Sequence, residues 1–395
     1  MSTQDVRQTV DVAVVGGGVM GAALATWLRT LDPSVSVAVV ERDPTWSRAS
    51  SALSAASIRQ QYTQPVNIEI SRQSLALLRG AADWLAVGDD RPDLGFQEDG
   101  YLYLAGVEGA QARREAHRLQ CALGADVALL TPDALTERFP WLNVADVELG
   151  TLGLSGEGWF DGYRLLTALH AKAKALGASF VRGDVVAMTV EDARVRTLAL
   201  SDGRQLSAGS VVNAAGPWAR SVGAMAGIPL PVTASRRTVF VLECPTPLPR
   251  CPLLIDTSGF WLRPEGAYFI GGIVPVDAGD GRPLEPELDT FEEDFWPLLA
   301  HRIPAFEALR VVRAWAGYYE MNTFDHNAIV GAHPTVRNFY CMNGFSGHGM
   351  QQAPAVGRAL AEQILFGEYR SLDLAPLAFE RIAAGRPLPE SAIIG

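Results

Sequence analysis

The sequence predicts an α/β protein, because three separate segments each place a short strand before a turn of small residues and a helix. In the first segment, the β-branched residues 10–15 lead into the glycine-rich residues 16–21, a helix, and a second strand at residues 35–40. The pattern recurs at residues 211–219 and again at residues 338–366. Strands that alternate with helices in this way indicate a parallel sheet.

The composition excludes several classes of protein. A chain of 395 residues is long enough for two folding units that share a large core. Its 48% hydrophobic and 19% charged residues are typical of an ordinary soluble globular protein. The net charge of −11 argues against a nucleic-acid surface or a polybasic membrane anchor.

The chain carries no sign of secretion, a disulfide framework or a metal site. Residues 1–10 are polar, and no apolar run approaches the ~20 residues that span a bilayer. The histidines lack metal-like spacing, and four scattered cysteines form no CxxC pair: Cys121, Cys244, Cys251 and Cys341. We therefore expect a cytoplasmic protein without a bound metal.

The first glycine turn matches the GxGxxG pattern in the context that dinucleotide binding requires, namely strand, turn, helix, second strand and terminal acid. Gly16 permits the turn, and Gly18 lets the backbone approach a pyrophosphate at the helix N-terminus. Gly21 allows the helix to pack closely on the sheet. Glu41 can accept hydrogen bonds from a ribose 2′-hydroxyl and would repel a 2′-phosphate, so NADP is disfavoured.

Three further segments favour FAD over NAD. Residues 47–56 are small and rich in hydroxyl groups, which suits passage along a diphosphate and ribityl chain; a flexible loop is the alternative. A strand leads into a small-residue turn at residues 213–218, and a later turn holds Gly344, Gly347 and Gly349 before a helix. Clustered glycines cost conformational entropy unless the backbone must approach a ligand.

These motifs resemble the D-amino-acid oxidase/sarcosine oxidase (DAO) family of FAD-dependent oxidoreductases. The likeness includes residues 183–185 and Thr323-x-Asp325, and it runs from residue 10 to about residue 366. Residues 317–325 and 344–349 are most similar to the sarcosine oxidase β-subunit branch and its FAD-dependent oxidoreductase-domain relatives. The resemblance and the motifs together imply that FAD is held by Gly16, Gly18, Val19, Met20, Gly21, Glu41, Arg42, Ser50, Ser51, Val185, Ala214, Ala215, Gly216, Trp218, Gly344, Phe345, Ser346, Gly347, His348, Gly349 and Met350.

The resemblance also implies a Rossmann-like FAD-binding domain interleaved with a substrate domain built on a mixed, largely antiparallel β-sheet. The FAD-binding domain would comprise residues 1–85, 146–220 and 316–395, and the substrate domain residues 86–145 and 221–315. Local patterns agree, with helices expected at residues 105–123 and 163–176 and β-rich runs at 238–242 and 268–273. Residues 387–395 are expected to extend over the surface.

The implied activity is oxidation of the C–N bond of an amino-acid-like amine, an N-alkyl or D-amino acid, by hydride transfer to the flavin. The resulting imine would hydrolyse. Arg59 matches a carboxylate-binding arginine of the family, and its guanidinium suits bidentate capture; a surface or structural ion pair is the alternative. Tyr318 and Tyr319 would wall the pocket or belong to the core, and His348 would be a structural neighbour of the cofactor.

Three departures from the family pattern refine the expectation. Tyr318 stands where relatives attach FAD through a cysteine, and no histidine precedes His117, so FAD should be non-covalent. Gln351 replaces a lysine that helps to hold the substrate carboxylate, which weakens the case for a simple amino acid. Phe269 aligns with a lysine credited with promoting the reaction with oxygen, which favours a dehydrogenase with another electron acceptor.

Two other functions stay open. One is a flavin-binding assembly or scaffold protein with little turnover, and the other is an NAD dehydrogenase. The sequence leaves undecided the substrate and its stereochemistry, oxygen or another electron acceptor, the oligomeric state, and a possible partner subunit.

Overall fold

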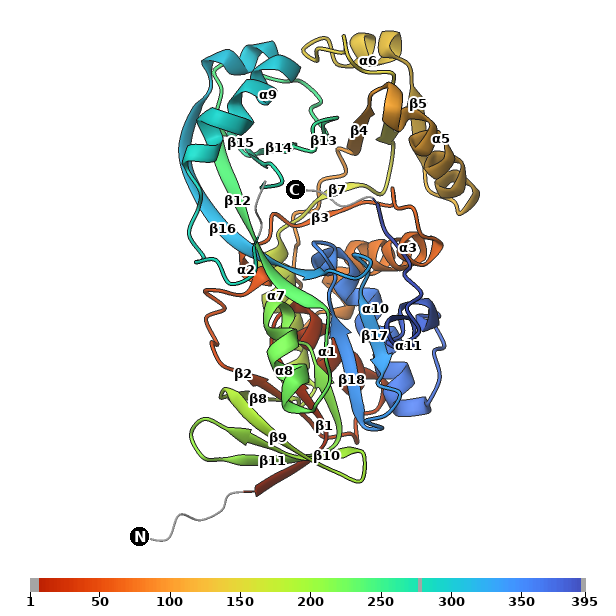
Figure 1. The fold of residues 1–395 in the computed structure, drawn as a ribbon, viewed down its shortest axis with the longest axis vertical. Coiled ribbons are helices and arrows are strands. Elements are labelled where there is room, and N and C mark those ends of the chain that lie inside the picture. Colours follow the sequence, from red (N-terminus) through yellow and green to blue (C-terminus); the bar gives the residue numbers. More distant parts are fainter. Residues whose placement is uncertain (1–6, 276–278, 392–395) are drawn as a thin grey trace.

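A computed structural model describes residues 7–275 and 279–391, and its two large β-sheets occupy opposite ends of the molecule (Figure 1). The first sheet has the order β17-β18-β11-β1-β2-β8, with β10 and β9 attached to β11. Its strands are β1 (Arg7–Val15), β2 (Val37–Glu41), β8 (Ser179–Arg182), β9 (Val185–Glu191), β10 (Arg194–Leu200), β11 (Gln205–Asn213), β17 (Ile329–Ala332) and β18 (Phe339–Asn343).

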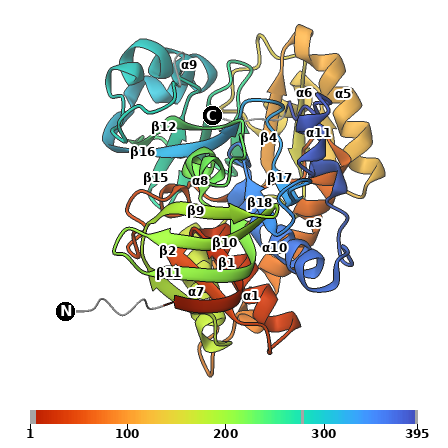
Figure 2. The same ribbon diagram turned by 60° about the horizontal axis from the view of Figure 1, so that its bottom comes forward.

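The middle of the first sheet is parallel. β1 pairs in parallel with β2 and β11, which pair in parallel with β8 and β18 respectively. Helix α1 (Val19–Leu31) contacts both α7 (Gly162–Ala175) and α10 (Gly349–Phe366), and its first ten residues are all buried. Figure 2 turns this sheet toward the viewer and shows β2, β1, β11, β10 and β9 side by side. The predicted α/β architecture is confirmed.

The second sheet has the order β16-β12-β15-β14-β13-β4-β6-β5. Its neighbours pair antiparallel except β13 and β4, which are parallel, so the predicted mixed and largely antiparallel sheet is confirmed. Its strands are β4 (Tyr101–Ala105), β5 (Val127–Leu130), β6 (Leu149–Gly153), β12 (Val232–Glu243), β13 (Leu253–Ile255), β14 (Trp261–Glu265), β15 (Tyr268–Gly272) and β16 (Arg310–Asn322).

The two sheets alternate along the chain, as expected for interleaved units. β4 to β6 come between β2 and β8, and β12 to β16 come between β11 and β17. One strand departs from the predicted division, because β6 pairs with β4 and β5 although residues 146–220 were assigned to the first unit. β16 also begins before residue 316. The domain boundaries stay predictions.

Short elements connect the sheets, and a two-stranded ribbon of β3 (Ser57–Ile58) and β7 (Gly158–Trp159) lies between them (Figure 1). Within residues 7–275 and 279–391, no helix combines the length and apolarity needed to cross a membrane. The remaining helices are α2 (Ser50–Leu53), α3 (Pro65–Arg79), α4 (Ala81–Trp84), α5 (Val107–Ala122), α6 (Pro132–Arg138), α8 (Ala219–Met225), α9 (Trp296–Arg302) and α11 (Glu380–Ala383).

The prediction of a surface extension at residues 387–395 is wrong at Glu390, which is 2% exposed. Its carboxylate accepts hydrogen bonds from the backbone N–H of Thr63 at 3.0 Å and from the Thr63 hydroxyl at 2.6 Å. It also accepts from the Gln64 N–H at 3.2 Å. Because Gln64 is the N-cap residue of α3, Glu390 satisfies backbone donors that this helix end leaves open. Residues 392–395 lie outside the described part of the chain.

Candidate functional site

A large cavity lies between the ends of the parallel strands and the second sheet. It is lined by the glycine turn after β1, by α2, by the start of α10, and by residues of β4, β12, β13, β14 and β16. Its empty space amounts to about 2010 Å³, including the part open to solvent.

The first glycine turn is packed too tightly for side chains. Gly16 has φ +106°, and a Cβ atom there would lie 2.4 Å from the carbonyl oxygen of Ala214. A Cβ on Gly21 would lie 2.0 Å from the carbonyl oxygen of Gly16. The absence of side chains at Gly16 and Gly21 therefore allows β1 to lie close to the end of β11 and α1 to pack on the turn. The N-terminus of α1 faces the cavity, which Gly18, Val19 and Met20 line.

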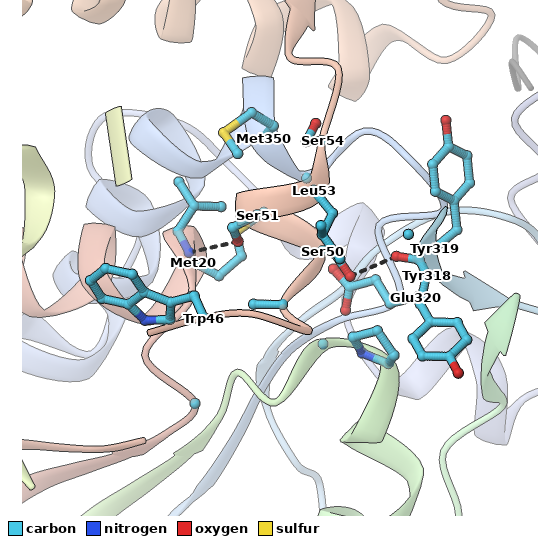
Figure 3. A pocket seen from close by; sticks show the side chains of 18 of the residues that line it. Met20, Trp46, Ser50, Ser51, Leu53, Ser54, Tyr318, Tyr319, Glu320 and Met350 are labelled. Carbon is cyan, nitrogen blue, oxygen red and sulfur yellow. Dashed lines mark hydrogen bonds between the residues drawn. The ribbon is translucent and has the colours of Figure 1, made fainter. Parts of the chain in front are cut away.

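The short helix α2 crosses the cavity between α1 and β16. The Ser51 hydroxyl accepts a hydrogen bond from the backbone N–H of Val19 at 3.0 Å, and the Ser50 hydroxyl donates to the carbonyl of Tyr318 at 2.6 Å (Figure 3). Both serines line the cavity. The segment is therefore an ordered wall of the site, and the alternative of a flexible loop is wrong.

Glu41 lines the cavity, as do Arg42 and Trp218, which form a cation–π pair. The two Glu41 carboxylate oxygens accept from the backbone N–H groups of Gly17 and Asp43, each at 2.8 Å. The guanidinium of Arg42 lies over the Trp218 ring, 3.8 Å from its centroid. Lining the same cavity are further residues that the sequence predicted as cofactor contacts: Val185, Ala214, Ala215 and Gly216.

The second glycine turn supplies lining residues in its later part. Gly347, His348, Gly349 and Met350 line the cavity, and they lead into α10. Four predicted cofactor residues do not line it: Gly21, Gly344, Phe345 and Ser346. They lie behind the wall instead, where Ser346 Oγ accepts from the Asn322 N–H at 3.0 Å and Phe345 is buried in the core beside α1 and α10.

Arg59 is a wall residue of the same cavity and is only 2% exposed, which excludes the alternative of a surface position. Its guanidinium lies 4.5 Å from the Tyr62 ring centroid and 5.8 Å from that of Tyr101. Its backbone N–H donates to Gln351 Oε1 at 2.9 Å, and its carbonyl accepts from the Ser71 hydroxyl. Gln351 therefore fixes the backbone that carries Arg59.

Tyr318 and Tyr319 point to opposite sides of β16, as Figure 3 shows, and both line the cavity. The Tyr318 hydroxyl donates to the carbonyl of Arg282 at 2.5 Å, and its ring meets Trp218 edge-on at 6.2 Å. Tyr319 packs against the second glycine turn, because a Cβ on Gly347 would lie 2.5 Å from its ring. Burial raises the pKa of Tyr319, while the charges of Arg237 and Arg59 act in the opposite direction.

In the described part of the chain, five acidic or basic residues line the cavity without having been predicted as site residues, namely Asp43, Arg48, Asp184, Arg237 and Glu320, and the last two come from the second sheet. Glu320 Oε2 accepts from the Gly344 N–H at 3.0 Å, and burial raises the pKa of this carboxyl to about 8 despite that hydrogen bond. Arg237 donates to Ser235 Oγ at 2.7 Å and lies over the Tyr319 ring at 4.9 Å. Glu320 and Arg237 lie in long strands, and only the fold shows which residues surround them. No local sequence pattern identifies them as site residues.

Phe269, which aligns with the lysine that relatives use for the reaction with oxygen, lies outside the cavity. Phe269 packs in the core on the far side of the second sheet, with its ring 5.2 Å from that of Phe306, and it does not line the cavity. Side chains alternate along β15, so Phe269 points away from the site while Ile270 faces it. Phe269 therefore carries no argument about oxygen, and the electron acceptor stays a prediction.

Two glycine turns that each open a helix onto one cavity, with an acid at the end of β2, define a dinucleotide-dependent oxidoreductase. The sequence model of the FAD dependent oxidoreductase (DAO) family matches residues 11–363, and the chain belongs to that family. Within the described residues, no group of three or more His, Cys, Asp or Glu side chains is arranged to hold a metal ion.

Similar proteins support this assignment. The chain is 42% identical to FAD-dependent oxidoreductase domain-containing protein 1 of Xenopus laevis, and the match covers 98% of this chain and 85% of that protein. The structure of L-proline dehydrogenase from P. horikoshii superposes with a TM-score of 0.86 at 26% identity, covering 97% of this chain and all of that one. Glycine oxidase from Geobacillus kaustophilus gives a TM-score of 0.80 at 25% identity, covering 94% and 98%.

Proposed function

We propose that this protein uses FAD to oxidise the C–N bond of an amino-acid-like amine, an N-alkyl or D-amino acid, to an imine that then hydrolyses. One observation carries the proposal: the buried guanidinium of Arg59 lies on the wall of the cavity into which both glycine turns open. The relatives named for proline dehydrogenase and glycine oxidase activity support the same reaction class. Oxygen or another acceptor would take the electrons.

The cavity fits FAD. Gly16 and Gly18 bring the backbone close to a diphosphate at the start of α1, and Glu41 offers carboxylate oxygens to ribose hydroxyls. The start of α10 faces the same cavity from the far end of the sequence and would lie against the flavin ring. When bound, the flavin supplies the hydride acceptor for the carbon next to nitrogen.

The chain's own residues would position the substrate. Arg59 would take the carboxylate with two parallel N–H···O bonds, which orients the α-carbon. Gln351 keeps Arg59 in place because its side-chain oxygen accepts a hydrogen bond from the Arg59 backbone N–H. Gln351 therefore acts as a positioning residue. Tyr319 would exclude water beside Arg59, because its ring fills the space next to Gly347.

FAD is proposed to be held without a covalent bond. The Tyr318 hydroxyl donates to the carbonyl of Arg282, and a phenol is no counterpart for the cysteine used by relatives. Acid precipitation of the purified protein should leave the yellow flavin in the supernatant. Flavin that stays with the precipitate would contradict this.

A reducing cytoplasm is the proposed compartment, in line with the four free cysteines in the described residues.

The test of the reaction is anaerobic flavin reduction by a panel of N-alkyl and free amino acids, with Arg59→Ala as the variant. Loss of a charge-assisted pair costs about 2 kcal/mol or more, so the second-order rate constant for flavin reduction by carboxylate substrates should fall roughly 30-fold or more. Matched amines without a carboxylate serve as the control and should be unaffected. Equal reduction of wild type and variant by carboxylate substrates would show that Arg59 has another role.

The same panel tests the alternative of a flavin-binding assembly or scaffold protein. That function predicts bound FAD, seen as a yellow protein, together with no reduction by any member of the panel.

A further inference from the structure

Part of the cavity wall formed by the second sheet is apolar, although Arg237 of β12 and Glu320 of β16 also line the cavity. Tyr101 of β4, Val239 of β12, Leu253 of β13 and Trp261 of β14 all line the cavity and are buried. They belong to one hydrophobic cluster on the face of the sheet that looks toward the first sheet. Four strands therefore contribute to a continuous apolar surface.

The strand pairing explains why these side chains meet. Leu253 lies opposite Tyr101 across the β13–β4 pair, and Trp261 lies opposite Gly272 across β14–β15. The missing side chain at Gly272 lets the Trp261 indole lie over β15, since a Cβ there would lie 3.2 Å from Trp261 Nε1. The glycine thus helps to set the indole on the wall.

The wall lies close to the substrate-binding arginine. Tyr101 is both a wall residue and a neighbour of Arg59, whose guanidinium is 5.8 Å from its ring centroid. A carboxylate held by Arg59 would leave the substituent of the same molecule facing Tyr101, Leu253 and Trp261. Burying a substituent of leucine or phenylalanine size against apolar carbon is favourable, by about fourfold in affinity for each methylene.

The charges around the wall argue against a cationic substituent. Among the described residues, the acidic side chains that line the cavity are Glu41, Asp43, Asp184 and Glu320, and none comes from β4, β12, β13 or β14. A lysine-like side chain would therefore lose its hydration without gaining a counter-charge on this wall.

We infer that the site selects a carboxylate-bearing amine with a bulky, neutral, apolar substituent, rather than glycine, sarcosine or a cationic amino acid. The inference rests on the proposed function for the reacting amine, whereas the apolar wall itself can be tested with unreactive carboxylates.

The first experiment measures binding of acetate, 4-methylpentanoate and 3-phenylpropanoate to the FAD-bound protein by flavin difference spectra. Affinity should rise at least tenfold from acetate to the larger ligands. Leu253→Ala should remove most of that gain while acetate binds as before, and Val239→Ala on the neighbouring strand is a second variant should Leu253→Ala not fold.

The matched control is Leu254→Ala, since Leu254 is the next residue of β13 and is buried in the core on the opposite face. It should leave the ranking of ligands unchanged, with Leu254→Val as a milder replacement. Equal affinity for acetate and the larger ligands, or no effect of Leu253→Ala and Val239→Ala, would overturn the inference.

The second experiment compares flavin reduction by glycine, sarcosine, leucine, phenylalanine, lysine and glutamate, as both enantiomers and N-methyl forms where these exist. The largest kcat/KM is expected for the leucine and phenylalanine forms. Fastest reduction by glycine, sarcosine, lysine or glutamate would overturn the inference and leave the proposed function standing. Ranked carboxylate binding without any reduction would instead overturn the proposed function and support the apolar wall.

Discussion

Glu320 is an acid whose surroundings favour its neutral form. Burial raises its pKa to about 8, whereas the backbone hydrogen bonds from Gly344 and Phe345 lower it and do not fully compensate. A carboxyl with a pKa above its value in the unfolded chain contributes most to stability at low pH, and that contribution is lost as pH rises through about 8. The wall of the cavity therefore contains a group that titrates above neutral pH.

Glu320→Gln should remove a pH-dependent transition from the FAD-bound protein. In the wild type, the flavin absorption spectrum should change around pH 8, and the urea unfolding midpoint should fall as pH rises from about 5 to about 8, between the unfolded and folded pKa of this carboxyl. The variant should lack both changes. Glu368→Gln is the control, because Glu368 is exposed and pairs with Arg370 at the surface. Identical profiles of wild type and Glu320→Gln would mean that another group titrates.

Single residues differ in how far the sequence could identify them. Arg59 follows the hydroxyl-rich segment at a position that the family resemblance marks, and the structure places it on the cavity wall. Arg237 and Glu320 lie in long antiparallel strands, where an isolated charge is typical of a solvated edge. Only the folded structure, in which both residues line the cavity, shows that these side chains face inward.

At the scale of elements, the strand–turn–helix unit at the N-terminus depends on close backbone approach. Gly16→Ala should place a Cβ against the carbonyl of Ala214 and separate β1 from β11, so the purified variant should lose FAD. Gly203→Ala is the matched control, since Gly203 also has a positive φ, +88°, but has open space around it. The ratio of flavin to protein absorbance measures the outcome, and equal FAD content in both variants would contradict the argument.

The elements also show where local sequence patterns are sufficient. The helices at residues 105–123 and 163–176 were predicted within two residues, because hydrophobic periodicity is a local property. Helix α2 was left open between a loop and a ligand wall. Its order depends on hydrogen bonds from Ser50 to β16 and from α1 to Ser51, which join segments up to 268 residues apart.

For the whole molecule, the segment at residues 386–391 ties the end of the described chain to the start of α3. Glu390→Gln should weaken this tie, because an amide group would turn a donor toward the N–H groups of Thr63 and Gln64. Losing hydrogen bonds to a charged group costs roughly 1.5–3 kcal/mol, which lowers Tm by roughly 2–4 °C in a protein of this size. The exposed Glu368→Gln again provides the comparison.

The same variant should raise KM for carboxylate substrates more than it changes kcat, since the residues between Arg59 and α3 lose their anchor. Calorimetry measures Tm, and steady-state turnover with an artificial electron acceptor measures KM and kcat. A variant with unchanged Tm and unchanged KM would show that the segment is dispensable for the Arg59 loop.

The architecture of two interleaved units could be inferred from family resemblance, whereas its details required the structure. The division at residue 146 separated β6 from its partners β4 and β5, because no composition change marks that point. The burial of Glu390 was invisible for a different reason. An acidic residue between proline and serine is typical of a surface tail until its partner 327 residues away is known.

The long sequence separation of Thr63 and Glu390 also affects how the protein folds during its synthesis on the ribosome. Thr63 is synthesised 327 residues before Glu390, an interval of roughly 15–65 seconds at about 5–20 residues per second. Throughout that time, the loop next to Arg59 lacks the Glu390 carboxylate that accepts its backbone hydrogen bonds. For part of it, β1 also lacks β11, its parallel neighbour. The N-terminal half of the nascent chain therefore lacks one or both of these partners until the end of synthesis, and premature termination anywhere before residue 390 would leave the loop next to Arg59 without its cap.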